Sequence, residues 1–275
     1  MTGARARLDE LAAAWHVDIE HVRTSGRAVL GFGVQRQRAI VLKLSASTAA
    51  EPFATAVLEA FDGRGVVRVY EQATDAVLVE RAIPGHSLAE VVARDGDDAA
   101  TRLLAHIIAQ MSPGQAPAGV PTAMEWGRGF AQYRASGDAC IPTALVDDAQ
   151  DVFDRLVATQ RRERLLHGDL HHGNVVFDGT RGWMAIDPKG VVAELEFELG
   201  AALRNPWDQP SLFTDPGSIR RRAQILAASL DLDESRLLGW GFAQAVLAAI
   251  WMFEDECRLD CGHPYLALAE TLRSR

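Results

Sequence analysis

The segment RLLHGDLHHGNVVFDGTRGWMAIDPKG, residues 164–190, gathers side chains that can hold cations and move protons. Asp169 and Asn174 stand five residues apart, and Asp187 follows the apolar run WMAI. Phosphate transfer from ATP to a hydroxyl needs a carboxylate that orients the hydroxyl and accepts its proton, together with hard oxygen donors for Mg²⁺. The spacing therefore favours Asp169 as the proton acceptor, and Asn174 and Asp187 as oxygen ligands of Mg²⁺.

Two further features agree with this chemistry. The runs VVF and WMAI flank the turn DGTRG, which predicts a short hairpin that holds Asn174 and Asp187 in register. Lys43 ends the earlier apolar run AIVLK, as a lysine that contacts nucleotide phosphates would. Turn chemistry alone in the later segment would not account for that lysine.

Three histidines in the same segment leave another interpretation open. His167, His171 and His172 could form a zinc site, with Asp169 and Asn174 as ordinary turn residues. Adjacent histidines do not easily point at one ion, and the neighbouring oxygen donors favour Mg²⁺. We therefore expect His167 to be a packed histidine that steadies the loop.

The chain before this segment has the pattern of a small, largely antiparallel sheet. Four short runs rich in β-branched residues are separated by turn-prone or charged pieces, and one helix is expected to cross the sheet between the second and third runs. The runs are RAVLGFGV, RAIVLKLS, GVVRVY and DAVLVE, at residues 27–34, 38–45, 65–70 and 75–80.

After Glu80 the pattern becomes helical. A Pro-Gly break is followed by Ser87 and Glu90, the spacing of a capping box that opens a helix, and helical periodicity then dominates. The sequence predicts an α+β fold of two lobes. The first, residues 1–82, is a small nucleotide-binding sheet lobe, and the second, residues 83–275, is a larger, mostly helical lobe for catalysis and acceptor binding.

Length and composition are those of a globular protein. The 275 residues are 48% apolar and 24% charged, with a net charge of −9. This excess of acidic groups disfavours nucleic acid as a partner and suits a cationic or polar small molecule. No feature of the sequence implies an obligate protein partner.

The sequence predicts a cytoplasmic protein. Its three cysteines include no C-x-x-C pair, as is typical of a reducing compartment. Asp9 and Glu10 interrupt what would have to be the apolar region of a signal peptide. The apolar stretch at 241–253 is too short to span a bilayer, so we expect no membrane anchor.

Several motifs together resemble one known family. HGDLHHGN, RGW-x-x-IDP, LRNP and DLDESRLLGWGFAQAVLAAIW are similar to segments of the aminoglycoside phosphotransferases, in particular the streptomycin 6-phosphotransferases and hydroxyurea phosphotransferases. The likeness extends over nearly the whole chain and implies a bilobal protein-kinase-like fold that uses ATP and Mg²⁺. Gly168 stands where protein kinases carry arginine, which points to a small-molecule kinase.

The resemblance also implies roles for individual residues. Asp169 would be the catalytic base, Asn174 and Asp187 the Mg²⁺ ligands, and Lys43 the contact to the α- and β-phosphates. Glu51 matches the family's partner of that lysine better than Glu59 does, although Pro52 follows it directly.

The nucleotide itself leaves a weaker signal. No G-x-G-x-x-G stands in the turn at 24–29, and the short polar turns typical of the family make Ser25, Gly26 and Arg27 the candidates for covering the phosphates. Adenine is expected against backbone groups near Glu80, Arg81 and Ala82, which carry no side-chain signature, so the choice between ATP and GTP stays open.

The acceptor is the least defined part of the site. A polycationic acceptor needs carboxylates, and aromatic faces suit sugar rings, so Trp126, Trp207 and Trp251 could line a wall of the cleft. Glu198 is set apart, because the family usually has an acidic residue at its position that braces the catalytic loop. The acidic candidates are Glu194, Glu196, Glu198, Asp208, Glu254, Asp255 and Glu256.

The leading hypothesis is an ATP- and Mg²⁺-dependent kinase that phosphorylates a hydroxyl of a streptomycin-type aminoglycoside and confers resistance. A metabolite kinase for an amino sugar, hydroxyurea or a similar acceptor is the alternative within the enzymes, because a fold does not fix its substrate. A nucleotide-binding pseudokinase is the alternative that is not an enzyme. Such a protein would be expected to lack the proposed base, a metal ligand or the phosphate-binding lysine, and this chain retains all of them. They are Asp169, Asn174, Asp187 and Lys43.

Overall fold

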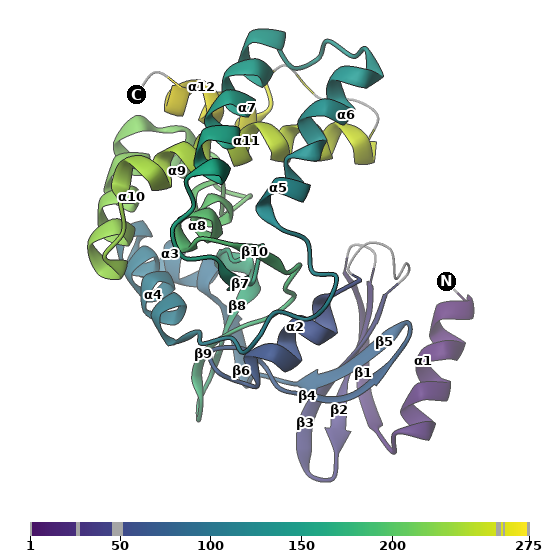
Figure 1. The fold of residues 1–275 in the computed structure, drawn as a ribbon. Helices are drawn as coiled ribbons and strands as arrows, with labels where there is room; N and C mark the ends of the chain where they lie inside the picture. The colour runs from purple at the N-terminus through teal and green to yellow at the C-terminus, as the bar shows by residue number, and fades with distance from the viewer. Residues whose placement is uncertain (1, 26–27, 46–51, 257–259, 261, 274–275) are drawn as a thin grey trace.

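The computed structural model describes residues 2–25, 28–45, 52–256, 260 and 262–273, and it shows a small sheet lobe beside a larger helical lobe (Figure 1). The small lobe holds a five-stranded antiparallel sheet in the order β1-β2-β3-β5-β4. Its strands are β1 (Asp18–Ser25), β2 (Ala28–Gln35), β3 (Arg38–Ser45), β4 (Val69–Ala73) and β5 (Ala76–Glu80).

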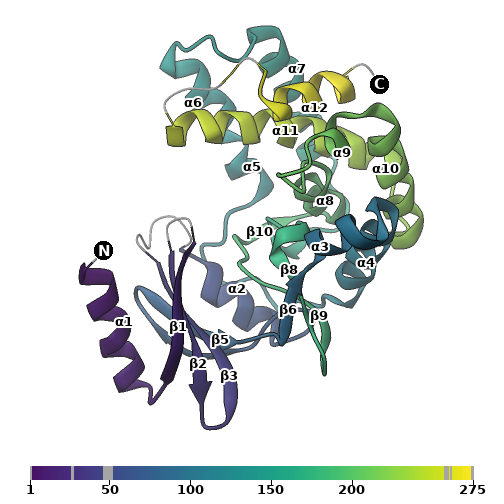
Figure 2. The ribbon, with the colours of Figure 1, turned by 180° about the vertical axis from the view of Figure 1, so that it is seen from behind.

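Two helices cover opposite faces of this sheet (Figures 1 and 2). α1 (Thr2–Ala14) packs Leu8 and Leu11 against buried residues of the strands such as Leu42. α2 (Ala54–Phe61) lies on the other face and is the crossing helix that the sequence predicts. α1 was not foreseen, because its buried apolar stripe is narrow.

The third predicted strand starts later than its sequence pattern indicates. β4 begins at Val69, whereas Val66 forms an isolated parallel bridge with Ala185 of the other lobe. The Ala185 N–H also donates to the Gly65 carbonyl at 2.8 Å. The first half of the run therefore ties the sheet lobe to the segment that carries Asp187.

The chain enters the helical lobe through β6 (Pro84–Ser87), which joins β8 (Val175–Asp178) and β9 (Gly182–Ala185) in a three-stranded sheet. α3 (Leu88–Asp95) follows directly. The predicted capping box is present at its start, where the Glu90 carboxylate accepts the Ser87 N–H at 2.8 Å. The predicted helix start is therefore confirmed.

The remaining elements are mostly helical, which confirms the α+β class. β7 (Arg164–Leu166) pairs with β10 (Val191–Ala193), and the short 3₁₀ helix η1 (His172–Asn174) precedes β8. The helices are α4 (Asp97–Gln110), α5 (Ala123–Trp126), α6 (Arg128–Ser136), α7 (Thr143–Ala158), α8 (Leu195–Leu203), α9 (Ser211–Thr214), α10 (Pro216–Leu230), α11 (Glu234–Glu256) and α12 (Pro264–Arg273).

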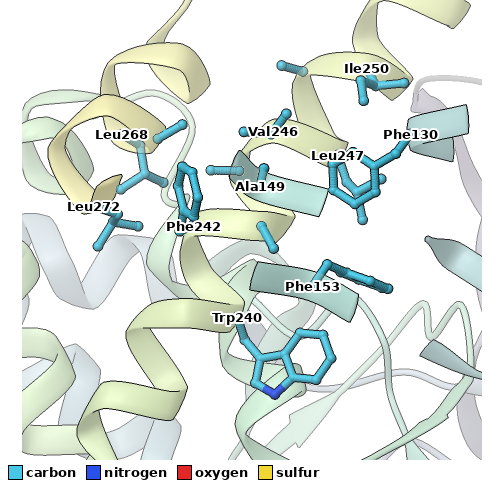
Figure 3. Close-up of a cluster of buried hydrophobic side chains, with 14 of the residues drawn as sticks. Phe130, Ala149, Phe153, Trp240, Phe242, Val246, Leu247, Ile250, Leu268 and Leu272 are labelled. Carbon is cyan, nitrogen blue, oxygen red and sulfur yellow. The ribbon is translucent and has the colours of Figure 1, made fainter. Parts of the chain in front are cut away.

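α11 is the central helix of this lobe. Trp240 meets Phe153 of α7 edge to face with ring centroids 5.2 Å apart, and Phe242 and Leu247 extend the same cluster (Figure 3). Among the described residues it is the one helix whose length and composition would suffice to cross a membrane, yet 67% of its most apolar window is buried. It is a core helix that reaches the site.

Candidate active site

The hairpin of β8 and β9 brings the two predicted metal ligands to one end. Val175 pairs with Ala185, so Asn174 precedes β8 at the same end at which Asp187 follows β9. The Ile186 N–H donates to the Asn174 carbonyl over 2.9 Å and extends the pairing by one step. The hairpin that the sequence predicts is thereby confirmed.

The loop that carries Asp169 is held by the buried carboxylate of a residue on α8. Glu198 of α8 accepts the N–H of His167 at 2.7 Å and the N–H of Gly168 at 2.9 Å. The His167 ring bonds the Ile186 carbonyl through Nε2 at 2.8 Å, and its Nδ1 accepts the Asp169 N–H at 3.3 Å. Both Glu198 and His167 therefore have the loop-bracing roles that the sequence predicts.

Gly168 is required by the backbone of this loop. Its φ is +82°, in the left-handed region that β-carbons disfavour, and a Cβ there would approach the Gly190 nitrogen at 3.2 Å. A larger residue would push the loop away from the segment after β9. Asp169 is aimed into the site from this tight turn.

Substituting Glu198 with glutamine is expected to change how stability depends on pH. Burial raises the pKa of Glu198 to about 7, although backbone N–H groups oppose it. The folded state then binds a proton that the unfolded state releases, so the free energy of unfolding falls as pH rises from about 4.5 to about 7, by up to about 3 kcal/mol. Glutamine does not titrate, so the variant should lose less stability than the wild type between pH 5 and pH 7.5. Urea unfolding of both proteins at the two pH values measures this. An equal loss of stability in the two proteins would contradict the expectation.

Asp169 lies between two cations. The Lys189 ammonium is 3.2 Å from Oδ2, and Arg204 Nη2 is 3.5 Å from Oδ1. Burial alone would raise the pKa of Asp169, but Lys189, the His171 ring and Arg204 outweigh it and lower that pKa to about 2. The carboxylate therefore stays ionised at neutral pH, as an acceptor of a hydroxyl hydrogen bond must.

Lys43 and Asp187 meet across the two lobes. The Lys43 ammonium, on β3, is 2.9 Å from Asp187 Oδ1. Asp187 has φ of +56°, a left-handed conformation that a non-glycine residue adopts at a cost of about 1–3 kcal/mol. Strain of this kind clusters at functional positions, and here it directs the carboxylate toward Lys43.

Asn174 and Asp187 have the donor chemistry that Mg²⁺ prefers. The Asn174 amide nitrogen donates to the Asp169 carbonyl at 3.0 Å, which leaves its Oδ1 for another partner, and Lys43 holds only Oδ1 of Asp187. Two hard oxygens thus remain at the end of the hairpin. No cluster of three His, Cys, Asp or Glu side chains that could hold a metal occurs in the described part of the chain.

The three histidines of the segment have separate surroundings. His171 accepts the Gly173 N–H on Nδ1 at 3.0 Å, while His167 bonds Ile186. His172 is buried, and neither ring nitrogen has a partner among the described residues, for which we have no physical account. The side chains do not converge on one point as a zinc site would require.

The connection between the lobes uses part of the backbone that adenine was expected to meet. The Glu80 N–H donates to the Arg68 carbonyl at 2.9 Å, and the Arg81 N–H donates to the Ala39 carbonyl at 3.1 Å. These two donors are therefore engaged within the protein. The Glu80 carbonyl and the Ala82 N–H take part in neither bond.

Some of the predicted nucleotide residues lie outside the described residues, namely Gly26, Arg27 and Glu51. Ser25 is exposed at the end of β1, opposite Ala28 on β2, so the predicted turn does connect the first two strands. Glu59, the less favoured partner of Lys43, accepts instead from Gln72 Nε2 at 3.1 Å.

A cavity of about 390 Å³ is lined by Lys189, whose ammonium is the one that lies 3.2 Å from Asp169 Oδ2. Trp126 and Trp251 form part of its wall, with ring centroids 5.3 Å apart in an edge-to-face contact. Its charged groups besides Lys189 are Glu125 and Arg128. Two of the three predicted tryptophans therefore do meet in one wall.

The third tryptophan belongs to a different group. Trp207 is 49% exposed and packs against Tyr265, with ring centroids 5.2 Å apart, rather than against Trp126. The three tryptophans that could have lined one wall therefore do not all do so, because Trp207, between α8 and α9, packs against Tyr265 of α12.

The acidic candidates are mostly structural. Glu194 accepts from the Trp240 indole at 2.6 Å and pairs with Arg236, and both Glu196 and Glu198 are buried. Asp208 and Glu254 are exposed, whereas the side chains of Asp255 and Glu256 lie outside the described residues. The carboxylate at the cavity, Glu125, was not among the candidates, because it reads in the sequence as a capping residue, which it also is.

Arg204 is a site residue that the sequence did not single out. The residue is 4% exposed, and its guanidinium donates to Gln244 Oε1 at 3.2 Å as well as facing Asp169. Gln244 is itself buried and donates to the Phe197 carbonyl. The signal available was the polar Gln244 that interrupts the apolar run of α11, because a buried polar side chain needs a partner.

Comparison with known proteins agrees with this geometry. The family model described as "aminoglycoside/hydroxyurea antibiotic resistance kinase" matches residues 14–256. A streptomycin 6-kinase of Streptomyces glaucescens is 30% identical over 98% of this chain and 89% of its own. A hydroxyurea phosphotransferase of Kitasatospora aureofaciens is 31% identical over 99% of this chain and 80% of its own.

Solved structures show the same fold at low sequence identity. An aminoglycoside phosphotransferase in ternary complex with ADP and hygromycin B aligns with a TM-score of 0.65 and 14% identity over 97% of each chain. A choline kinase of Streptococcus pneumoniae aligns with a TM-score of 0.64 and 14% identity over 100% of each chain. The fold is thus protein-kinase-like, and the chain belongs to the aminoglycoside and hydroxyurea antibiotic resistance kinases.

Proposed function

We propose that the protein transfers the γ-phosphate of ATP to a hydroxyl of a streptomycin-type aminoglycoside and so confers resistance. The observation that carries this proposal is one bonded network. Lys43 pairs with Asp187, Ile186 bonds Asn174, and Asn174 bonds the backbone of Asp169. The network is found in a chain related to streptomycin 6-kinases.

ATP would lie between the lobes, whose division we place after Ala82. Its adenine would use the Glu80 carbonyl and the Ala82 N–H, and its phosphates would meet Lys43, held in place by Glu51. The turn of Ser25, Gly26 and Arg27 would cover the phosphates. These residues and the lobe boundary are part of the proposal.

Asn174 and Asp187 would hold Mg²⁺, because their remaining oxygens fit its preference for hard donors. When bound, Mg²⁺ neutralises charge that develops on the phosphates. Lys43 adds a second positive charge at the same place, and the strained backbone at Asp187 keeps its carboxylate at the end of the hairpin.

In the transfer step, Asp169 accepts a hydrogen bond from the acceptor hydroxyl and orients it. A bond forms between the hydroxyl oxygen and the γ-phosphorus, the bond from that phosphorus to the bridging oxygen breaks, and ADP leaves. The proton passes to Asp169. Lys189, the His171 ring and Arg204 lower the pKa of Asp169, so its carboxylate is ionised and can accept the hydroxyl hydrogen bond before the transfer begins.

The acceptor would enter the cavity beside Lys189. Indole faces of Trp126 and Trp251 suit a sugar ring, and Glu125 offers a carboxylate to a cationic group. Because ATP is made inside cells, we place the enzyme in the cytoplasm. We propose no nucleic acid, membrane or obligate protein partner.

A second candidate function is phosphorylation of hydroxyurea or another small hydroxyl compound. The observation that favours it is the charge of the cavity, where Lys189 and Arg128 outnumber Glu125. Such a balance suits a neutral or weakly polar acceptor better than a polycation.

The test is an ATP-consumption assay with Mg²⁺ across streptomycin, hygromycin B, an amino sugar and hydroxyurea, followed by mass spectrometry of each product. We expect streptomycin to gain one phosphoryl group. Product formed from hydroxyurea or the amino sugar alone would overturn the aminoglycoside assignment in favour of the second candidate. No phosphorylated product from any of the four would contradict both.

A further inference from the structure

The chain uses lysine at only two positions, Lys43 and Lys189, while it uses arginine 26 times. Both lysines lie in the site, and each contacts one of its two aspartates. Lys43 pairs with Asp187 and Lys189 pairs with Asp169. All other Lys or Arg positions of the chain are arginine. We infer that these two positions need a property of the lysine ammonium that the arginine guanidinium lacks.

The chemical difference between the two side chains defines that requirement. Arginine presents a rigid planar fork, whereas lysine presents a compact ammonium with three donors on a flexible stem. At an exposed position either one serves as a solvated cation. Lysine is needed where a charge must fit a small space and change partner.

Lys189 has a fixed backbone and a movable head. The N–H groups of Lys189 and Gly190 both donate to the His167 carbonyl at 2.9 Å, which attaches this segment to the loop of Asp169. The Lys189 side chain is 44% exposed and lines the acceptor cavity. Arg204, the other cation on Asp169, is 5% exposed in its side chain and is also held by Gln244.

The acceptor hydroxyl and the Lys189 ammonium both need access to Oδ2 of Asp169. A hydroxyl that donates to Asp169 must reach one of its two oxygens; Arg204 approaches Oδ1 from the buried side, and Lys189 holds Oδ2 from the cavity side. At Oδ2 the entering hydroxyl therefore competes with Lys189. Its anchored backbone keeps the ammonium near the reacting atoms, where the transferring phosphoryl group carries the largest negative charge.

We propose that Lys189 is a catalytic residue, whose ammonium exchanges Asp169 for the oxygens of the transferring phosphoryl group as the acceptor binds. This inference rests on the proposed phosphotransfer and not on the identity of the acceptor. Lys189 stays protonated throughout. The hydroxyl proton goes to Asp169, the new oxygen–phosphorus bond forms, and the bond to the ADP oxygen breaks.

Steady-state kinetics of Lys189→Met and Lys189→Arg test this role. We expect Lys189→Met to lower kcat by about 10²–10³-fold, the usual effect of removing one donor to a developing charge, with the Kd for ATP within about two-fold of wild type. Lys189→Arg should recover less than about a tenth of kcat, because its fork cannot make the same exchange. The matched control is Arg5→Met, which removes one cation of an exposed ion pair on α1.

Full recovery of kcat by Lys189→Arg would overturn the proposal, because a fixed cation beside Asp169 would then suffice. Wild-type kcat in Lys189→Met would overturn it as well. A fall in kcat that only accompanies a lower melting temperature would show a structural role.

An NMR experiment tests the same residue without an antibiotic acceptor, because a water molecule can take the place of the acceptor hydroxyl at Asp169. Protein grown on lysine labelled with ¹³C at Cε should give two lysine signals, and the Lys189→Arg variant assigns them. We expect MgADP with aluminium fluoride, a mimic of the transferring phosphoryl group, to shift the Lys189 signal, while MgADP alone leaves it in place. An unchanged Lys189 signal with the mimic would overturn the proposal, whereas a shift in a protein that phosphorylates none of the tested antibiotics would uphold it and refute the aminoglycoside assignment alone.

Discussion

Replacing Asp169 with asparagine is expected to lower kcat for phosphotransfer by about 10³-fold, while the affinity for ATP stays within about two-fold of wild type. The amide keeps the size of the carboxylate but cannot take the hydroxyl proton. It also removes the negative charge that Lys189 and Arg204 face. Nucleotide binding relies on other residues, so product formation and ATP titration should separate the two effects.

The control for this variant is Asp154→Asn, because Asp154 is exposed on α7, where its Oδ2 accepts a hydrogen bond from Gln150 Nε2 at 3.3 Å. The Asp154→Asn variant should have the same kcat as the wild type. Asp169→Asn would contradict the role of the base if it kept more than about a tenth of the wild-type kcat.

Replacing Arg222 with methionine is expected to lower the free energy of unfolding by about 3–5 kcal/mol, because it leaves a buried charge without its partner. Arg222 is 1% exposed, and its Nε lies 2.8 Å from one oxygen of Asp97 and 3.0 Å from the other. Its Nη1 also donates to the Asn205 carbonyl at 2.6 Å. The pair joins α10 to the start of α4 and holds the chain just after Arg204.

Thermal unfolding measures this effect, and a fall of the melting temperature by about 10 °C is expected for a chain of this size. The double variant Arg222→Met with Asp97→Leu should recover much of the loss, because no unpaired charge remains. Arg5→Met serves as the exposed counterpart and should change the free energy of unfolding by less than about 0.5 kcal/mol. A loss below about 1 kcal/mol in Arg222→Met would contradict the expectation.

The parts of the site that could be predicted are those set by local spacing. Asp169, Asn174 and Asp187 lie within one hairpin and its loop, so their order along the chain already brings them together. Lys43 could be added because it stands at the end of the run AIVLK, within β3 and two residues before that strand ends. For the same reason the change from a sheet lobe to a helical lobe and the capping box at Ser87 could be predicted from turn and cap signals.

The rest depends on contacts between distant segments. Lys189 and Arg204 are separated from Asp169 by 20 and 35 positions. Lys189 stands in the segment 164–190 and Arg204 in the motif LRNP, but no spacing rule predicts that either side chain contacts Asp169. Nothing in the sequence distinguishes Trp207 from Trp126, but Trp207 packs against Tyr265. The α1 helix carries too few apolar residues to give a clear periodicity, and it is stabilised by the sheet on which it packs.

Apart from Lys189, the cavity beside the Asp169 loop draws its charged residues from exposed positions that take no part in holding that loop. Glu125 and Arg128 are exposed on the short α5 and on α6, and the catalytic loop is held instead by Glu198 from the buried α8. Substitution of an exposed residue without a capping role, such as Arg128, changes stability by about 0.5 kcal/mol or less. Selection by a new antibiotic can therefore retune which molecules are recognised through single substitutions, each leaving the phosphate-transfer machinery intact, so this architecture is one from which resistance to further compounds can evolve in small steps.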